Sequence, residues 1–243
     1  MLVVAKTDIG KVRSSNQDSY NIGEFQNGVV WAVVCDGMGG ANGGNVASAT
    51  AVKMISDKIT TCYYDGMSGN SIRNMLLSSI ETANACVYEM GQSNDSLLGM
   101  GTTVVAAVVT ADTAYIAHAG DSRAYLFDGG TLSQLTKDHS VVQDMVERGQ
   151  LTQEEARVHP SKNLITRALG VESTLAIDFY EEDFYKDDVL MICTDGLTNF
   201  VDPETLNSTF KESDFGDFAD KLVEIANDNG GGDNITVVAI ANN

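Results

Sequence analysis

The sequence predicts an α+β fold: two antiparallel sheets pack face to face, and helices cover their outer faces in a four-layer α-β-β-α sandwich. Three observations lead to this prediction. Short apolar runs separated by tight turn signals fill much of the chain. Two long segments of helical period follow the first of these runs, and a further helix precedes the last run. Elements in this order favour two paired sheets flanked by helices.

The expected strands are short strand-like runs bounded by turn signals. They cover residues 2–5, 18–23, 29–35, 102–110, 113–119, 123–127, 131–135, 189–194 and 235–241. Turn signals such as Gly120-Asp121-Ser122 and Asp128-Gly129-Gly130 join several of them into a meander of hairpins. The runs before Asp36 and Asp195 are almost continuously apolar, so both faces of those strands should be covered.

Helical period is clearest in two segments after the first strands. Apolar residues recur at spacings of three and four between about 46 and 59, and again between about 71 and 90. A later helix is expected over about 215–229. Asp202-Pro203-Glu204 predicts the start of a short helix, with the aspartate as N-cap and the proline at the first position.

The stretch 137–170 differs from the rest of the chain, because it is polar and interrupts the strands. It contains a helix-like run, Ser140–Arg148, and a second helix start at Thr152-Gln153-Glu154-Glu155, which has capping-box spacing. We interpret it as a flap inserted over the rim of the sheets. With no linker or repeat elsewhere, residues 1–243 are expected to form a single domain that contains this flap.

Composition excludes several classes of protein. The net charge is −19, with 34 acidic and 15 basic residues, which disfavours binding to nucleic acid. No run approaches the roughly 18 consecutive apolar residues that span a bilayer, so no membrane association is expected. Four cysteines without C-x-x-C spacing favour free thiols in a reducing cytoplasm. Their positions are Cys35, Cys62, Cys86 and Cys193.

Three aspartates stand at the ends of apolar strands. Asp36 and Asp195 each follow a buried run and precede a glycine, and Asp233 comes immediately before the last strand. In an antiparallel sheet the end of one strand can lie beside the start of its neighbour, so all three can meet at one rim. Gathered carboxylates repel one another unless cations hold them, and hard divalent cations prefer oxygen ligands. Asp121 could reach the same rim or belong to a plain hairpin turn.

Several motifs together resemble the metal-dependent serine/threonine phosphatases of type 2C, the PPM family, in its compact bacterial form. The resemblance runs from about residue 3 to 241, and the motifs occur in the order seen in that family. They are Arg13-x-x-Asn16-Gln17-Asp18, Asp36-Gly37-Met38-Gly39-Gly40, Gly101-Thr102-Thr103, Gly120-Asp121-Ser122-Arg123, Asp195-Gly196-Leu197 and Gly232-Asp233-Asn234. Each motif alone would be weak, but their shared order is a specific signal.

The resemblance implies a centre of two metal ions, Mn²⁺ or Mg²⁺, with a third and weaker site. By this analogy Asp36 bridges two ions and the Gly37 carbonyl completes one of them. Asp195 and Asp233 would hold the other ion, and Asp18 would act through bound water. Asp121 with Asp195 would hold the third ion, Asn234 would support Asp233, and Arg13 would grip the substrate phosphate.

The implied reaction is hydrolysis of phosphoserine and phosphothreonine in proteins by direct attack of a metal-bridging water. Two ions supply a deprotonated water and neutralise the phosphoryl oxygens, and a guanidinium matches two of those oxygens. The implied partners are phosphorylated proteins, including a cognate serine/threonine kinase, and we expect a monomer. The alternative is a catalytically silent relative that acts as a regulatory module, which should have lost a bridging carboxylate or Arg13.

The sequence also departs from the family pattern. Many relatives carry a histidine at the position of Met38 or of Ala41, and this chain has neither, so the proton donor to the leaving group is unassigned. His118 is expected to be a satisfied core or rim residue. His139 could face the site, and His159 is expected on the surface of the flap.

Overall fold

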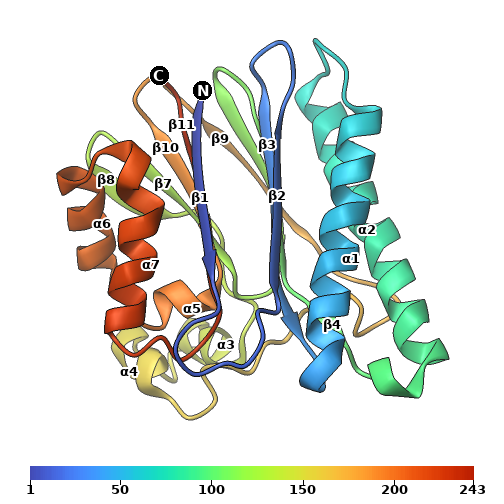
Figure 1. Cartoon of the computed structure of the whole chain (residues 1–243). Coiled ribbons are helices and arrows are strands. Elements are labelled where there is room, and N and C mark those ends of the chain that lie inside the picture. The colour runs from blue at the N-terminus through green and yellow to red at the C-terminus, as the bar shows by residue number, and fades with distance from the viewer.

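The computed structural model describes the backbone of residues 1–243 and the side chains of residues 1–39 and 43–243. Ala41, one of the two positions that lack the family's histidine, therefore lies outside the described side chains. Two antiparallel sheets stand side by side in the middle of the molecule, and one pair of helices covers each outer face (Figure 1). This is the predicted four-layer α-β-β-α sandwich.

The first sheet contains five strands in the order β1-β11-β10-β7-β8. Their bounds are β1 Leu2–Asp8, β7 Arg123–Asp128, β8 Thr131–Gln134, β10 Val189–Cys193 and β11 Ile235–Ala241. The second sheet has the order β2-β3-β5-β6-β9, and the short β4 pairs with the end of β3. Its bounds are β2 Asp18–Glu24, β3 Val30–Met38, β4 Gly101–Thr102, β5 Val104–Val109, β6 Thr113–Ala119 and β9 Asp178–Asp183.

Seven α-helices and two short 3₁₀ helices surround the sheets. Helices α1 (Gly40–Cys62) and α2 (Gly69–Ser93) cover the second sheet, and α6 (Pro203–Glu212) and α7 (Phe218–Asp228) cover the first (Figure 1). The short helices α3 (Val141–Glu147), α4 (Gln153–Val158) and α5 (Asp195–Thr198) gather at the end of the molecule opposite to both termini. The 3₁₀ helices are η1 (Asp95–Leu97) and η2 (Phe215–Asp217).

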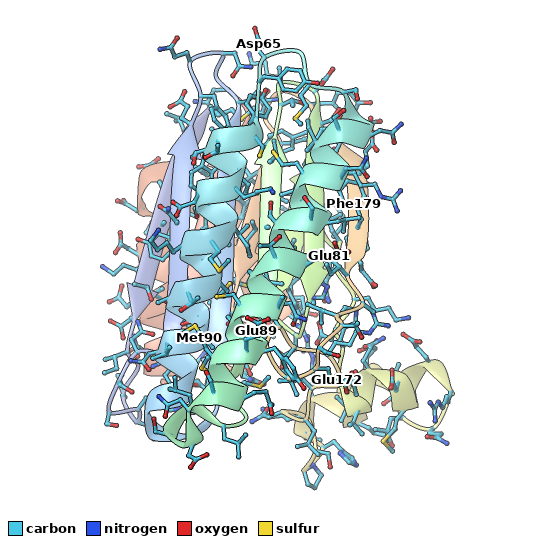
Figure 2. The ribbon with its side chains drawn as sticks, turned by 90° about the vertical axis from the view of Figure 1, so that its right-hand side faces the viewer. Asp65, Glu81, Glu89, Met90, Glu172 and Phe179 are labelled. Atoms are coloured by element: carbon cyan, nitrogen blue, oxygen red, sulfur yellow. The ribbon has the colours of Figure 1, made fainter. Side chains whose placement is uncertain are left out.

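Three apolar clusters hold the layers together. One lies between α1, α2 and the second sheet, one lies between α6, α7 and the first sheet, and the third fills the space between the sheets. Figure 2 shows α1 and α2 side by side, with the exposed Glu81 and Glu89 on α2. Strands β3 and β10 are covered on both faces, as their continuous apolar runs predict: Val30–Cys35 and Val189–Cys193 are all buried.

Most expected elements are confirmed, and the caps explain several boundaries. Asp202 accepts the N–H of Thr205 and caps α6 with Pro203 at its first turn. Thr152 and Glu155 form the predicted capping box at α4. Asp195, which was expected in the strand-end turn, instead begins the short helix α5.

Three expectations are corrected. Strand β3 does not end at residue 35, because β4 pairs with it at Gly37 and Met38 and extends it past Asp36. The run 102–110 is interrupted at Thr103, whose N–H donates to the Asp36 carbonyl between β4 and β5. The single helix over 215–229 is a 3₁₀ turn followed by α7.

Strand β9 was not predicted at all. Its sequence, Asp178 to Asp183, is mostly acidic and does not alternate in the usual way. It pairs only with β6, so it is the edge of its sheet, where charged side chains reach solvent. On the edge of a sheet, composition is a weak guide to strand formation.

Candidate metal centre

The carboxylates singled out in the sequence come together at the end of the sandwich where α5 lies. A pocket of about 460 Å³ is lined by all the predicted site residues except Asp18, namely Arg13, Asp36, Gly37, Asp121, Asp195, Asp233 and Asn234. The two sheets supply them from separate parts of the chain. Convergence of this set in one pocket is what the spacing of the aspartates predicts.

The pairing of β2 with β3 brings the first two carboxylates together. Asp18 stands directly opposite Asp36 in the register, so both side chains project from the same face. Like charges placed this way repel, and burial adds to the cost of ionising them. Burial, reinforced by the charges of Asp18 and Asp195, raises the pKa of Asp36 well above its ordinary value.

Asp18 lies behind the pocket in a buried position. One oxygen, Oδ2, accepts hydrogen bonds from the hydroxyls of Thr194 at 2.9 Å and Thr236 at 2.7 Å. The other oxygen, Oδ1, is buried without a hydrogen-bond partner among the described residues. Burial raises the pKa of Asp18 to about 7 despite these two bonds. An unsatisfied buried carboxylate oxygen is costly unless a cation or water meets it.

Asp195 follows strand β10 of the first sheet, and like Asp18 it has one hydrogen-bonded and one unpartnered carboxylate oxygen among the described atoms. Its Oδ2 accepts from the side-chain amide of Asn199 at 2.9 Å, while its Oδ1 is buried without a partner among the described atoms. Its carboxyl group lines the same pocket as that of Asp36. Burial and the neighbouring charge of Asp233 raise the pKa of Asp195. Two carboxyl groups from different sheets therefore meet in one pocket.

Asp121 occupies the turn between β6 and β7 and faces the same pocket, so it is more than a plain hairpin residue. Burial, followed by the charges of Asp195 and Asp138, raises the pKa of Asp121 well above its ordinary value. The carboxylates thus form one electrostatically linked group. Divalent cations would relieve both the repulsion and the unsatisfied oxygens.

Asp233 and Arg13 form an ion pair across the pocket, with Arg13 Nη2 2.7 Å from Asp233 Oδ2. Among the described residues, no three His, Cys, Asp or Glu side chains stand close enough to enclose one cation as they are placed. The carboxylates are adjacent, but Asp233 is turned toward the guanidinium.

Asn234 fastens the loop that carries Arg13. Its Oδ1 accepts the N–H of Gln17 at 2.8 Å, and its Nδ2 donates to the carbonyls of Ile9 at 2.9 Å and Ser15 at 3.0 Å. Its own N–H donates to Asp233 Oδ1 at 2.8 Å. These contacts support the expectation that Asn234 positions Asp233, and they add a role that the motif alone did not indicate.

Two glycines allow the backbone to pack closely around the carboxylates. A Cβ on Gly37 would lie 2.1 Å from the carbonyl oxygen of Gly44, and one on Gly196 would lie 1.9 Å from that of Asn234. Both distances are far below a van der Waals contact, so only glycine fits. The glycine after each strand-end aspartate therefore keeps neighbouring segments in place.

The roles of several supporting residues were not recognised in the sequence. Thr194 and Thr236 hold Asp18, and Thr103 Oγ1 accepts the N–H of Asp36 at 2.9 Å. A signal existed for Thr236, because it is a polar residue inside the otherwise apolar strand β11. Thr103 stood in the motif Gly101-Thr102-Thr103 without an assigned role, and Thr194 follows a strand, where threonine is common.

The histidines are placed differently from some expectations. His139 is buried and does not line the pocket beside Arg13, so it does not face the site. His118 is buried, but neither ring nitrogen makes a hydrogen bond of normal geometry among the described residues, although the Ser122 backbone lies close. It is therefore a core residue but not a satisfied one. His159 is partly exposed in segment 137–170.

Comparison with known proteins agrees with this geometry. Residues 11–236 match the sequence model of the family described as protein phosphatase 2C. The chain belongs to the protein phosphatase 2C family. It is therefore a phosphoprotein phosphatase, and it is similar to bacterial members of the family.

Individual relatives of the protein phosphatase 2C family are similar over almost the whole chain. The serine/threonine phosphatase stp of Listeria welshimeri is 38% identical over 241 residues, covering 98% of this chain and 94% of that protein. The protein phosphatase PhpP of Streptococcus pneumoniae is 36% identical, covering 98% and 96%.

Solved structures of the protein phosphatase 2C family share the fold. The serine/threonine phosphatase of S. agalactiae superposes with a TM-score of 0.91 at 38% identity, covering 99% of this chain and 98% of that one. The catalytic domain of the phosphatase PstP, solved in complex with two manganese ions, gives a TM-score of 0.85 at 31% identity, covering 98% and 96%.

Among the described residues, no helix combines the length and apolar character needed to cross a membrane.

Proposed function

We propose that this protein hydrolyses phosphoserine and phosphothreonine in other proteins, at the pocket lined by Arg13 and the carboxylates. The observation that carries the proposal is the meeting of Asp36, Asp121 and Asp195 in one pocket, with a buried carboxylate oxygen of Asp195 that has no partner among the described atoms. Oxygen donors of this kind suit Mn²⁺ or Mg²⁺.

The proposed ligands follow the positions of the carboxylates. Asp36 would bridge two ions, the Gly37 carbonyl would complete one ion, and Asp195 with Asp233 would complete the other. Asp18, buried behind Asp36, would act through a water molecule. When bound, two such ions supply an ionised water and neutralise charge on the phosphoryl oxygens. The protein's own part is to hold the oxygens in place through Thr194, Thr236 and Asn234.

Arg13 is proposed to bind the substrate phosphate. Its side chain is half exposed at the pocket and pairs with Asp233, so it can exchange that carboxylate for a phosphate without leaving the site. A guanidinium donates two parallel hydrogen bonds to phosphate, which a lysine cannot reproduce.

Replacing Arg13 with alanine is therefore expected to raise KM for an aryl phosphate by roughly 10- to 100-fold, since hydrogen bonds to charged groups contribute about 1.5–3 kcal/mol. Arg13→Lys should recover only part of this loss. Steady-state kinetics at saturating Mn²⁺ give the measurement. Arg73→Ala is the matched control, because the Arg73 guanidinium lies over the ring of Phe179, 5.2 Å from its centroid, and does not line the pocket. Unchanged KM in Arg13→Ala would contradict phosphate binding by this residue.

Asp121, together with Asp195, is proposed to hold a third and weaker ion, because it reaches the pocket from the side of segment 137–170. Asp121→Asn should remove the weakest phase of Mn²⁺ binding in calorimetry and leave the tighter phase within about twofold, since waters supply most ligands of such a site. Loss of all Mn²⁺ binding, or no change in any phase, would refute the separate third site.

We also propose that residues 1–243 act as one catalytic unit, with residues 137–170 as a flap over the pocket. The support is that Asn163 and Ile165 of this segment line the pocket beside Arg13. We propose a cytoplasmic monomer whose substrates include a cognate serine/threonine kinase. Light scattering and dephosphorylation of an autophosphorylated kinase test the last two points.

The direct test of the proposed activity uses phosphopeptides. Phosphothreonine and phosphoserine peptides should release phosphate in the presence of Mn²⁺ or Mg²⁺, and chelation should stop the release. A phosphotyrosine peptide of the same sequence should react much more slowly. No release from any phosphopeptide at millimolar Mn²⁺ would contradict the proposal and favour a silent regulatory protein.

A further inference from the structure

His139 occupies a junction that the proposed reaction does not use. It is 5% exposed and follows Asp138 at the beginning of the flap. Its backbone N–H donates to the Gly120 carbonyl at 2.8 Å, and its backbone carbonyl accepts the N–H of Thr166 at 2.8 Å. The imidazole adds contacts to Gly120, Asp178 and Arg167. One residue thus contacts both ends of the flap and the turn that carries Asp121.

The imidazole of His139 must hold its proton on Nε2. Nδ1 lies 3.0 Å from the backbone nitrogen of Gly120, which is a donor, so Nδ1 accepts and carries no proton. Nε2 lies 3.1 Å from Asp178 Oδ2 and 3.0 Å from Arg167 Nη1, which is itself a donor. A neutral imidazole whose Nδ1 accepts carries its proton on Nε2, so Nε2 donates to Asp178. Arg167 Nη1 lies 2.9 Å from Asp178 Oδ1 and fixes that carboxylate in turn. Burial lowers the pKa of His139, which keeps the ring neutral as this arrangement requires.

The turn held by His139 connects directly to the carboxylates. Gly120 precedes Asp121, and the next residue, Ser122, shares a hydrogen bond of 2.7 Å with Thr103. Thr103 accepts the N–H of Asp36 and donates its own N–H to the Asp36 carbonyl. The turn is therefore held on one side through Thr103 and on the other through His139. Without the second contact, the buried N–H of Gly120 would lose its partner.

We propose that His139, as the neutral Nε2–H tautomer oriented by Asp178, is a positioning residue that clamps the Gly120–Ser122 turn to the base of the flap. It acts through this turn on Asp121 and does not touch substrate. The functional consequence rests on the proposed role of Asp121 as a metal ligand, whereas the clamp itself does not. The stacked ring of His118, 4.7 Å away, backs the imidazole and limits its rotation.

Two substitutions of His139 test the contacts of its two ring nitrogens separately. Asparagine places its amide oxygen near the position of Nδ1, so His139→Asn keeps an acceptor for the Gly120 N–H. The longer glutamine reaches toward the position of Nε2, so His139→Gln keeps a donor for Asp178 but leaves Gly120 without an acceptor. His159→Gln, on the partly exposed part of the flap, is the matched control.

The expected result is that His139→Gln raises the Mn²⁺ concentration for half-maximal activity about tenfold, which corresponds to one lost hydrogen bond. His139→Asn should shift it less than about threefold, and His159→Gln should not shift it. Calorimetry should show the same order for the weakest Mn²⁺ phase. Equal shifts in the asparagine and glutamine variants, or none in either, would overturn the proposal.

A measurement on the wild-type protein, without any metal or variant, tests whether His139 holds the Gly120–Ser122 turn. Nitrogen-15 NMR of the imidazole in chelator should show an unprotonated Nδ1 and a protonated Nε2, and the Gly120 amide should exchange slowly with solvent. The opposite tautomer or rapid exchange at Gly120 would overturn the clamp. A wild-type protein that shows this tautomer but hydrolyses no phosphopeptide would instead contradict the proposed function.

Discussion

Asp36→Asn is expected to lower Mn²⁺-dependent hydrolysis of an aryl phosphate by at least about a thousandfold, because Asp36 is the residue proposed to hold both ions. The same substitution should stabilise the protein in chelator. Burial and neighbouring carboxylates raise the pKa of Asp36 in the folded state, so ionising it at neutral pH opposes folding. Neutral asparagine removes that opposition, and the free energy of unfolding should rise by roughly 1 kcal/mol or more.

The predicted gain in the free energy of unfolding of Asp36→Asn can be tested by its dependence on pH. The gain should be present at pH 7 and disappear below about pH 4, where the carboxyl group is protonated in both folded and unfolded states. Activity assays and chelator-containing denaturation curves supply the two readouts. Asp220→Asn on α7, which breaks an exposed ion pair with Lys6, is the control: it should leave activity unchanged and alter stability by less than about 1 kcal/mol. An active Asp36→Asn, or one that is less stable in chelator, would contradict the role given to this residue.

Gly196→Ala is expected to have the largest effect on stability. The new Cβ would lie 1.9 Å from the carbonyl oxygen of Asn234, a backbone atom that cannot move aside as a flexible side chain would. Relieving the clash requires α5 to separate from the segment before β11, at a cost of about 3 kcal/mol. For a chain of this length that corresponds to a fall of roughly 10 °C in Tm. Because Asp195 precedes Gly196, Mn²⁺ affinity should fall with stability.

A second glycine provides the control for this substitution. Gly216 lies in η2, and a Cβ there would meet no atom within 4 Å. Gly216→Ala should therefore leave Tm within about 2 °C and Mn²⁺ affinity unchanged. Thermal denaturation of both variants in chelator isolates the steric effect from metal binding. A Gly196→Ala protein as stable as Gly216→Ala would show that the close approach of α5 to Asn234 is not required.

The sequence was most informative where one physical signal dominated. Continuous apolar runs identified β3 and β10 because both strands are covered on two faces, and periodic apolar residues identified α1 and α2. Strand β9 was not predicted, because an edge strand needs no apolar pattern. The extension of β3 through Asp36 was not predicted either, because it depends on pairing with the two-residue strand β4, which lies far away in the sequence.

At the site, too, the sequence predicted some features and not others. Aspartates at strand ends could be recognised because strand geometry predicts where they meet, and Asp36 and Asp195 do meet. The contacts that hold them could not be recognised, because Thr103, Thr194 and His139 act through three-dimensional neighbours such as the Asp36 backbone. Nor could sequence reveal that Asp233 is turned toward Arg13, which depends on the position of the loop fastened by Asn234.

Calorimetric titration of Mn²⁺ into the wild-type protein and into Asp36→Asn tests the central claim most directly. If acidic side chains from both sheets jointly hold the ions, the wild type should bind at least two Mn²⁺ per chain and the variant should lose the tighter binding. Absence of Mn²⁺ binding to the wild type at millimolar concentration, or the same stoichiometry and affinity in both proteins, would contradict the claim.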